Sequence, residues 1–381
     1  MVERPLRVGL NLLWLGERAG GAGRAARGLV EGLLAAEPGT EVHLFLARDA
    51  PAGLAAEPWW GAVRCHHLPV PAGGGLRTLA AQHAGLPALA LARGLDVLHS
   101  PANTGPVTAP RLATAITLLD LIWWHHPDQW EGDPAAHRAI RRQALYAVRR
   151  ADVVLAISRV AAEDIAATLD VDRARLAVAP LGVSAEAPAR PSPEPQLRAS
   201  LGLGPGRVIL CVAQKRPYKN LAGLVRALAE VEGTLVLPGS PTEHERELRA
   251  LAEELEVGAR VRFVDWVSEE DLEGLYRLAD CFVLPSFIEG FGLPVLEAMR
   301  RGVPVACSDA GSLPEVAGDA ALLFDPHDAS EIAAAIGRLQ ADGALRERLI
   351  ECGRRRCSEL TWEATGHAAL HAYRRAIAAS S

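Results

Sequence analysis

The chain has 381 residues, of which 49% are hydrophobic and 23% are charged, as in ordinary globular proteins. This length predicts two domains of usual size and excludes a single small module. The formal net charge of −6 argues against nucleic acid as the main partner, because phosphate binding normally needs a basic surface.

The cysteines, the N-terminal segment and the lengths of the apolar runs indicate in which cellular compartment the protein is expected. The six cysteines are scattered without a CxxC pair, and several lie inside apolar runs, which predicts reduced and buried thiols. The start of the chain carries the acidic Glu3 and leads into a strand pattern, unlike an export signal. No run approaches the roughly 18 apolar residues of a membrane-spanning helix. We therefore expect a cytoplasmic protein, with a position at the inner face of the membrane left open.

Short β-branched runs alternate with Ala-, Leu- and Arg-rich helical stretches through residues 1–182, the expected N-terminal domain. Strands are predicted at residues 7–15, 42–47, 96–100, 113–121 and 152–158, with a helix from about 23 to 36. This alternation predicts a parallel sheet covered on both faces. Residues 183–195 are rich in Pro, Ala and Ser without periodicity, and we expect a linker there.

The same alternation restarts in residues 196–361, which predicts a second doubly wound α/β domain. Strands are expected at residues 207–213, 233–239, 261–265, 281–286 and 303–309. Residues 362–381 form a last predicted helix, which we expect to return to the N-terminal domain. Because ligands of open α/β sheets bind beyond the carboxyl ends of the strands, two Rossmann-like domains facing each other predict a central cleft lined by the loops after strands.

The sharpest motif is EGFGLPVLE, residues 289–297, after the strand expected at 281–286. The amides of Phe291, Gly292 and Leu293 are expected at a helix N-terminus, where free N–H groups and the helix dipole favour an anion such as a diphosphate. Glu297, expected in the first helical turn, can accept hydrogen bonds from ribose hydroxyls. The alternatives are that Glu297 only complements the helix dipole and that Glu289 is a solvated loop acid.

Only two of the 40 basic residues are lysines, and they lie four residues apart in the loop after the strand expected at 207–213. Lys219 precedes a helix expected from Asn220, where a cation is unfavourable beside the helix dipole. A bound diphosphate would explain it. Lys215 or Arg216 can support the same phosphate, or these residues form a solvated charge cluster.

These segments resemble the signature of retaining glycosyltransferases of family 4, the group that includes mannosyltransferases. The resemblance extends over nearly the whole chain and includes GGAGRAARGL near the start, DLIWWHHPDQW and the pair Lys219-Asn220. It implies the GT-B fold, with an N-terminal acceptor domain and a C-terminal donor domain. It also implies that Lys219 contacts the β-phosphate of the donor, Glu289 its sugar, Glu297 its ribose and the amides of residues 291–293 its diphosphate.

The implied reaction moves a sugar from a nucleotide-diphosphate sugar to a hydroxyl acceptor, which can be a glycan, a lipid-linked saccharide or a secondary metabolite. No DxD motif lies on an expected strand-end loop, so we expect neither a metal nor another cofactor. Gly21 and Gly23 are expected in a loop over the donor phosphates. Their spacing also matches a dinucleotide fingerprint, which keeps an epimerase or dehydrogenase open, although the candidate acid Asp49 lies 28 residues beyond Gly21.

The segment TLLDLIWWHHPDQW departs from the family pattern. Relatives of the mannosyltransferase type usually carry a histidine at the position of Leu119, before the retained Asp120, which remains a catalytic candidate. The missing histidine keeps open a non-catalytic homologue, which would be a nucleotide-sugar-binding protein or a partner subunit of another enzyme.

Acceptor candidates follow in the same region. Trp123, Trp124 and Trp130 can stack on an acceptor sugar or pack beneath the loop. His125 is a further candidate, although it does not obviously replace the missing histidine. Asn103 belongs to the resembling segment DVLHSPAN and is an acceptor candidate as well.

Residues 138–150 predict a basic amphipathic helix, with apolar Ile140, Ala144, Ala147 and Val148 on one stripe and arginines around the rest. Such a helix can lie on an anionic membrane surface. Its stripe consists mostly of small residues, which is more typical of an ordinary surface helix.

Overall fold

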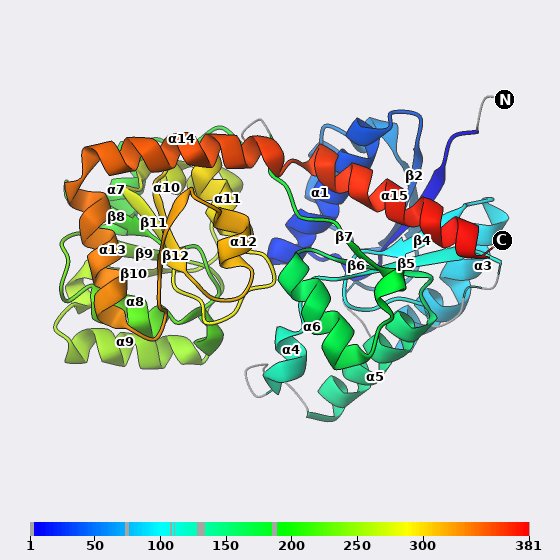
Figure 1. Ribbon diagram of the computed structural model, residues 1–381, viewed down its shortest axis with the longest axis horizontal. Helices are drawn as coiled ribbons and strands as arrows, with labels where there is room; N and C mark the ends of the chain where they lie inside the picture. Colours follow the sequence, from blue (N-terminus) through cyan, green and yellow to red (C-terminus); the bar gives the residue numbers. More distant parts are fainter. Residues whose placement is uncertain are drawn as a thin grey trace. The chain divides into compact units, whose positions relative to one another are not determined.

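The computed structural model describes residues 4–72, 76–106, 109, 111–127, 134–184 and 189–380. The chain divides into two compact units, one formed by Met1–Gly182 with Leu360–Ser381 and the other by Val183–Glu359 (Figure 1). The described residues of the expected linker, 183–184 and 189–195, are grouped with the second unit. There Ser192 donates a hydrogen bond to Asp271 at 2.6 Å, and helix α7 begins at Glu194. Residues 185–188 lie outside the described residues.

The first unit contains a seven-stranded parallel sheet in the order β3-β2-β1-β4-β5-β6-β7. Its strands are β1 (Arg7–Leu12), β2 (Glu41–Ala47), β3 (Arg64–Leu68), β4 (Val97–Ser100), β5 (Ala113–Leu118), β6 (Val153–Ala156) and β7 (Leu176–Val178). Both edge strands, β3 and β7, are absent from the predicted strands. β3 is partly exposed and reads RCHHL, and β7 has three residues, so neither shows the continuous apolar run of a central strand.

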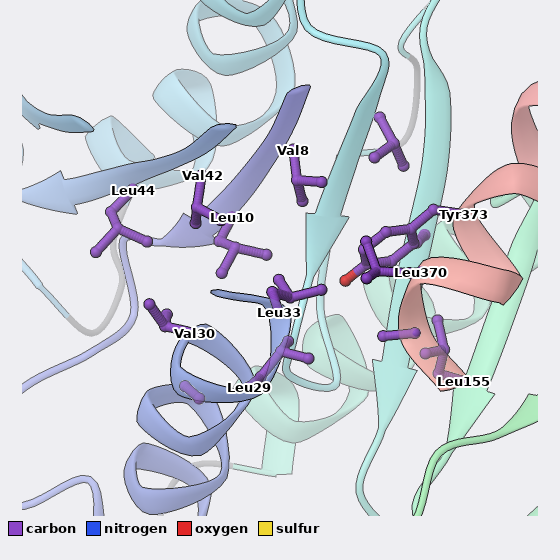
Figure 2. Packing of buried hydrophobic residues seen from close by; sticks show 14 of the residues in the cluster. Val8, Leu10, Leu29, Val30, Leu33, Val42, Leu44, Leu155, Leu370 and Tyr373 are labelled. Carbon is purple, nitrogen blue, oxygen red and sulfur yellow. The ribbon is translucent and has the colours of Figure 1, made fainter. Parts of the chain in front are cut away.

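Helices cover this sheet. The α-helices are α1 (Gly20–Ala36), α2 (Leu76–Ala80), α3 (Leu86–Ala92), α4 (Ile122–His125), α5 (Pro134–Arg150), α6 (Arg159–Leu169) and α15 (Trp362–Ser380). Shorter turns are η1 (Ala52–Ala56), η2 (Trp60–Ala62), η3 (Ala81–Gly85) and η5 (Arg173–Arg175). Figure 2 shows how Leu29 and Leu33 of α1 and Leu370 of α15 join the side chains of the central strands in one buried cluster.

Helix α15 packs on α1 because glycines let the two backbones approach closely. A Cβ at Gly28 would lie 2.1 Å from Cε2 of Trp362, and one at Gly32 would lie 2.0 Å from the carbonyl oxygen of Trp362. Tyr373 of α15 is fully buried, and its hydroxyl lies 2.6 Å from Nδ1 of His99 on β4. The last helix is thus anchored in the first unit by packing and by a buried hydrogen bond.

The second unit contains a six-stranded parallel sheet in the order β10-β9-β8-β11-β12-β13. Its strands are β8 (Val208–Leu210), β9 (Thr234–Pro238), β10 (Val261–Val264), β11 (Cys281–Leu284), β12 (Val305–Ser308) and β13 (Ala321–Phe324). Its helices and short turns are α7 (Glu194–Leu201), η6 (Pro217–Lys219), α8 (Leu221–Ala227), α9 (His244–Glu254), η7 (Gly258–Arg260), α10 (Glu269–Leu278), α11 (Leu293–Arg300), α12 (Leu313–Ala317), α13 (Ala329–Ala341) and α14 (Gly343–Glu359). The edge strand β13 is again absent from the predicted strands, and its residues 321–323 are half-buried or exposed.

The predicted class of two Rossmann-like, doubly wound α/β domains is confirmed by these two sheets. In each sheet the strand order reverses once, between β1 and β4 in the first unit and between β8 and β11 in the second. Ligands of open α/β sheets bind at such switch points, beyond the carboxyl ends of the strands. The loops after β8 and β11 are therefore the place to look for a site in the second unit, and those after β1 and β4 in the first.

Candidate active site

The loops after β8 and β11 meet beyond the sheet of the second unit. The amide of Phe287 donates to the carbonyl of Tyr218 at 2.9 Å. One residue further along the first loop, the ammonium of Lys219 donates to Oε1 of Glu289 at 2.6 Å. The two side chains retain 16% and 9% of their exposure. The structure thus joins two sequence-predicted residues, 70 positions apart, in one ion pair that still reaches solvent.

Local chain geometry places Lys219 at the end of η6, just before α8. Asn220 has the left-handed φ of 51°, and its side chain caps α8 by accepting from the amide of Gly223 at 3.2 Å. The helix therefore begins at Leu221, one residue later than predicted. A cation beside a helix N-terminus is unfavourable, and the carboxylate of Glu289 offsets this cost in the structure.

Glu289 is held by the loop after β12 as well as by its own loop. Its Oε1 accepts a hydrogen bond from the hydroxyl of Ser286 at 2.7 Å, and its carbonyl accepts one from the hydroxyl of Ser312 at 3.0 Å. Gly311 has a φ of 58°, and a Cβ there would lie 2.9 Å from the amide nitrogen of Glu289. These contacts give the carboxylate a defined position beside Lys219.

The amides of Phe291, Gly292 and Leu293 lie at the start of α11, as predicted. Gly292 has a φ of 95°, and a Cβ there would approach Leu313 Cδ2 to 2.3 Å, so the turn requires glycine. Within the described part of the chain, no acceptor takes a hydrogen bond from these three amides. Buried N–H groups without an acceptor are rare in proteins, so the start of α11 is arranged to receive an anion or water.

Glu297 is the fifth residue of α11, so it lies in the second helical turn and not in the first as predicted. The helix begins at Leu293, one residue earlier than expected. The carboxylate is buried, with 6% exposure for the residue, and its Oε2 accepts a hydrogen bond from the hydroxyl of Tyr276 at 2.9 Å. Tyr276 was not among the predicted site residues, because a tyrosine in an amphipathic helix pattern is indistinguishable from a core residue.

Lys215, a predicted support for the phosphate, contacts strand ends and an acid of the second unit. Its side chain is fully buried, and its ammonium donates to the carbonyls of Gly239 and Val264, beyond the ends of β9 and at the end of β10. Oε2 of Glu245 lies 3.7 Å from the same ammonium. Burial lowers the pKa of Lys215, and the nearby carboxylate of Glu245 makes the largest opposing contribution. Lys215 therefore links strand ends inside the second unit.

Arg216, the other predicted support for a phosphate, is half-buried. Its Nε donates to Oε1 of Gln214 at 3.1 Å, within the same loop. Its backbone carbonyl accepts a hydrogen bond from the amide of Lys219 at 3.0 Å.

In the first unit, the structure brings three predicted residues together after β4 and β5. Oδ1 of Asn103 accepts a hydrogen bond from the amide of Leu119 at 3.0 Å. Oδ1 of the next residue, Asp120, accepts a hydrogen bond from the amide of Ile122, the first residue of α4, at 3.0 Å. Leu119 itself is half-buried. Asp120 therefore has a local structural contact in addition to its predicted catalytic role.

Trp123 and Trp124 pack against the buried cluster of α5, α6 and β5. Their rings meet edge to face at 5.8 Å, and the guanidinium of Arg141 lies 4.2 Å over the ring of Trp124. His125 lies 2.9 Å from Asp164 on α6. Of the two predicted roles for the tryptophans, the structure shows packing. Trp130 lies outside the described residues.

The glycine-rich segment is helical, which corrects the predicted loop over the donor. Helix α1 begins at Gly20, so Gly21 and Gly23 occupy its first turn. Gly21 is exposed, and a Cβ there would meet no atom within 4 Å. A Cβ at Gly23 would lie 2.7 Å from Cβ of Ala19. Gly23 thus serves close packing at the helix start, whereas the structure shows no packing reason for Gly21.

Helix α5 differs from its predicted stripe. Ala144, Ala147 and Val148 are buried as expected, but Ile140 is 44% exposed and lies outside the buried stripe. Tyr146 is 51% exposed.

Across the described ranges, no helix is both long and apolar enough to cross a membrane, and no group of three or more His, Cys, Asp or Glu residues could hold a metal ion.

Comparison with known families covers most of the chain. Residues 194–356 match the family Glycosyl transferases group 1, and residues 20–182 match the Glycosyl transferase 4-like domain. The chain belongs to the group 1 glycosyltransferases. The motif with Glu289 and Glu297, and also Lys219, lie within the first of these two matches, and Asn103, Leu119 and Asp120 lie within the second.

The chain is similar in sequence to two curated proteins and in fold to one solved structure, among others. The O-antigen chain mannosyltransferase B of Escherichia coli is 38% identical over 171 residues, which cover 43% of this chain and 45% of that protein. The MMP α-(1→4)-mannosyltransferase of Mycolicibacterium hassiacum is 31% identical over 271 residues, 67% of this chain and 61% of its own. The chain thus spans about half to three-fifths of these relatives. Anabaena HepE, solved in complex with UDP-glucose, shares the fold with a TM-score of 0.72 at 18% identity, over 96% of this chain and 99% of its own.

Proposed function

We propose that this group 1 glycosyltransferase moves a sugar from a nucleotide-diphosphate sugar to a hydroxyl acceptor, with retention of anomeric configuration and without a metal ion. The observation that carries the proposal is the ion pair of Lys219 and Glu289 beside the three amides at the start of α11. The mannosyltransferase relatives and the UDP-glucose complex of HepE support a nucleotide-sugar donor.

The chemistry follows from where charge develops. When the bond between the anomeric carbon and the β-phosphate oxygen breaks, negative charge grows on that phosphate. Preoriented cations and amides stabilise such charge most when water is excluded. An ammonium has three N–H donors, so Lys219 can hold Glu289 and a phosphate oxygen together. The amides of residues 291–293 would receive the other phosphate oxygens, and no metal is needed.

Retention requires that the acceptor oxygen bond to the anomeric carbon on the face that the phosphate leaves. We propose that the departing phosphate oxygen accepts the proton of the acceptor hydroxyl, so that one C–O bond breaks as another forms and the proton balances the leaving group. Glu289 positions the donor sugar and Lys219 in this scheme, and Glu297 binds the ribose.

A direct test measures nucleoside diphosphate release from UDP-glucose, GDP-mannose, ADP-glucose and a dTDP-sugar, with and without saccharide acceptors. The proposal expects release that an acceptor accelerates, that EDTA leaves unchanged, and that gives a product of retained configuration by NMR. Loss of activity in EDTA would refute metal independence. Binding without any release would indicate a non-catalytic homologue, and a change in nicotinamide absorbance would indicate a dehydrogenase.

Leu119 adds a proposal about the donor. Its backbone is held by Asn103 after β5, at the position where the resemblance leads one to expect a histidine near the sugar. An apolar side chain there tolerates a sugar that lacks a hydroxyl, such as a deoxysugar. Leu119→His should raise the use of a fully hydroxylated donor relative to the natural one, because a group that pairs with a hydroxyl discriminates strongly. A wild-type preference for GDP-mannose over deoxysugar donors would refute this proposal.

Helix α5 is proposed to contact an anionic membrane surface at the cytoplasmic face. Its outward side chains combine the exposed Ile140 and Tyr146 with exposed arginines, namely Arg138, Arg142, Arg149 and Arg150. Arginine near an anionic bilayer contributes about 1 kcal/mol per residue. Sedimentation with vesicles that contain phosphatidylglycerol should retain the protein, and vesicles of phosphatidylcholine alone should not. Equal binding to both, or to neither, would contradict the assignment.

A further inference from the structure

A buried group of side chains lies behind Glu297, between α10 and α11. Helix α10 contributes Glu273 and Tyr276, which are one turn apart, and Arg301 follows directly after α11. The side chains of Arg301 and Glu273 keep 4% and 2% of their exposure, and Tyr276 is fully buried. Neither the predicted reaction nor the predicted site residues account for this group.

The contacts form a chain that connects Glu273 to Glu297 through Arg301 and Tyr276. Nε of Arg301 donates to Oε2 of Glu273 at 2.8 Å, and Nη2 of Arg301 donates to the same oxygen. The guanidinium lies 4.3 Å over the ring of Tyr276, and Nη1 donates to the backbone carbonyl of Glu297 at 2.7 Å. The hydroxyl of Tyr276 then donates to Oε2 of Glu297 at 2.9 Å.

Each contact restricts the orientation of the next group. Glu273 fixes the plane of the Arg301 guanidinium, because a carboxylate and a guanidinium pair in a defined geometry. The cation over the Tyr276 ring attracts its face, and Phe282 packs against the same ring with centroids 5.9 Å apart. A cation over the ring also withdraws electron density from the phenol, which makes its hydroxyl a stronger donor. The tyrosine is therefore held in one rotamer with its hydroxyl on Glu297.

We propose that Tyr276 is a positioning residue that orients the Glu297 carboxylate toward the ribose hydroxyls of the donor, with Arg301 holding the tyrosine in place. This inference rests on the proposed ribose role of Glu297. A carboxylate accepts up to about four hydrogen bonds, so the contact with Tyr276 is compatible with two more from a ribose diol. One fixed oxygen also limits rotation of the carboxylate, which reduces the entropy lost when the ribose binds.

The test compares the binding of a nucleoside diphosphate that has the ribose hydroxyls with the binding of one that lacks them. Calorimetry gives the Kd of UDP and GDP for the wild type, and the tighter of the two is then compared with its 2′,3′-dideoxy form. We expect the wild type to prefer the ribose form at least tenfold. Tyr276→Phe keeps the ring and its packing, and it should weaken binding of the ribose form roughly tenfold while leaving the dideoxy form within twofold. The KM of the donor should rise in parallel, with kcat within about twofold.

A double-mutant comparison shows whether the tyrosine acts through Glu297. In a Glu297→Gln background, Tyr276→Phe should change the Kd by less than twofold, because the carboxylate that it positions is gone. Tyr373→Phe is the matched control, since it removes another fully buried tyrosine hydroxyl, bonded to His99 in the first unit. It should lower stability without changing the preference for ribose. Should Tyr276→Phe not fold, Arg301→Lys keeps a cation beside Glu273 but loses the planar contact over the ring, and it should show a smaller loss of the same preference.

The outcomes separate this inference from the proposed function. If the wild type does not distinguish the two ligands and Glu297→Gln binds normally, the ribose role of Glu297 fails and Tyr276 has nothing to position. If Glu297→Gln loses the preference while Tyr276→Phe keeps it, the ribose role stands and the inference is overturned. Equal weakening of both ligands by Tyr276→Phe would also overturn it, because a purely structural defect acts on both.

Discussion

Replacing each of two lysines in one loop by methionine should have different effects. One substitution should weaken nucleotide binding, and the other should lower the stability of the fold. Lys219 and Lys215 are four residues apart, and methionine removes the charge of each while keeping much of the stem. The ammonium of Lys219 reaches solvent and contacts Glu289, whereas that of Lys215 is fully buried against two carbonyls and Glu245. The same chemical change is therefore made in two different environments.

For Lys219→Met, the expected loss is one of ligand binding. A hydrogen bond to a charged group contributes about 1.5–3 kcal/mol, which corresponds to roughly 10–150-fold weaker binding of a nucleoside diphosphate. The effect on stability should be smaller than that of Lys215→Met, because the ammonium of Lys219 is not fully buried and Glu289 keeps the hydroxyl of Ser286. Transfer should fall with the lost stabilisation of the departing phosphate.

For Lys215→Met, the expected loss is one of folding. Removing one partner of a buried ionic group costs about 3–5 kcal/mol, since the carbonyls of Gly239 and Val264 and the carboxylate of Glu245 lose their donor. In a unit of this size, this loss lowers the melting temperature by about 6–20 °C. Nucleoside diphosphate affinity, measured well below the new transition, should stay within about threefold of the wild type.

Calorimetry with UDP and GDP, together with thermal melts of the two variants, provides the comparison. The reasoning is refuted if Lys215→Met melts like the wild type but no longer binds the nucleotide, because Lys215 would then contact the donor. Normal turnover by Lys219→Met would remove the phosphate role of Lys219.

Three other outcomes are expected. Glu289→Gln should lower kcat by about 10²-fold or more while nucleoside diphosphate affinity changes less than tenfold, and an unchanged kcat would exclude its role at the sugar. Gly28→Val should destabilise the first unit by about 3 kcal/mol or more, because its side chain would overlap Trp362, and an unchanged melting temperature would contradict the packing. Burial lowers the pKa of His99 to about 3 from 6.5. The unfolded chain therefore binds more protons between these values, and acidification below pH 6.5 should destabilise the first unit by about 1.4 kcal/mol per pH unit from this residue, a slope that His99→Gln should reduce in pH-dependent melts.

Much of the fold and part of the site are encoded locally. Alternating apolar runs and helical stretches predict the central parallel strands, because burial on both faces requires continuous apolar segments. Strand-end loops then predict where Lys219, Glu289 and the amides of residues 291–293 lie, since parallel strands all present their carboxyl ends at one edge. The resemblance to family 4 glycosyltransferases rests on the same local segments, and the family matches confirm it.

Edge strands and the last helix depend on tertiary contacts. Strands β3 and β13 have partly exposed residues, so their pairing with β2 and β12 is not visible as an apolar run. Helix α15 lies on α1 because Gly28 and Gly32 leave room for Trp362, a fit between surfaces more than 300 residues apart in the chain.

The same distinction applies to the charged residues of the site. Lys215 and Lys219 are identical in type and neighbours in sequence, yet one is buried at strand ends and the other meets a carboxylate 70 residues away. Tyr276 has the pattern of a core residue and nevertheless places its hydroxyl on Glu297. Sequence by itself determines which groups can carry charge or donate a hydrogen bond, whereas burial and partner are properties of the packed chain. Only the tertiary structure decides them, because both depend on residues that local spacing does not bring together.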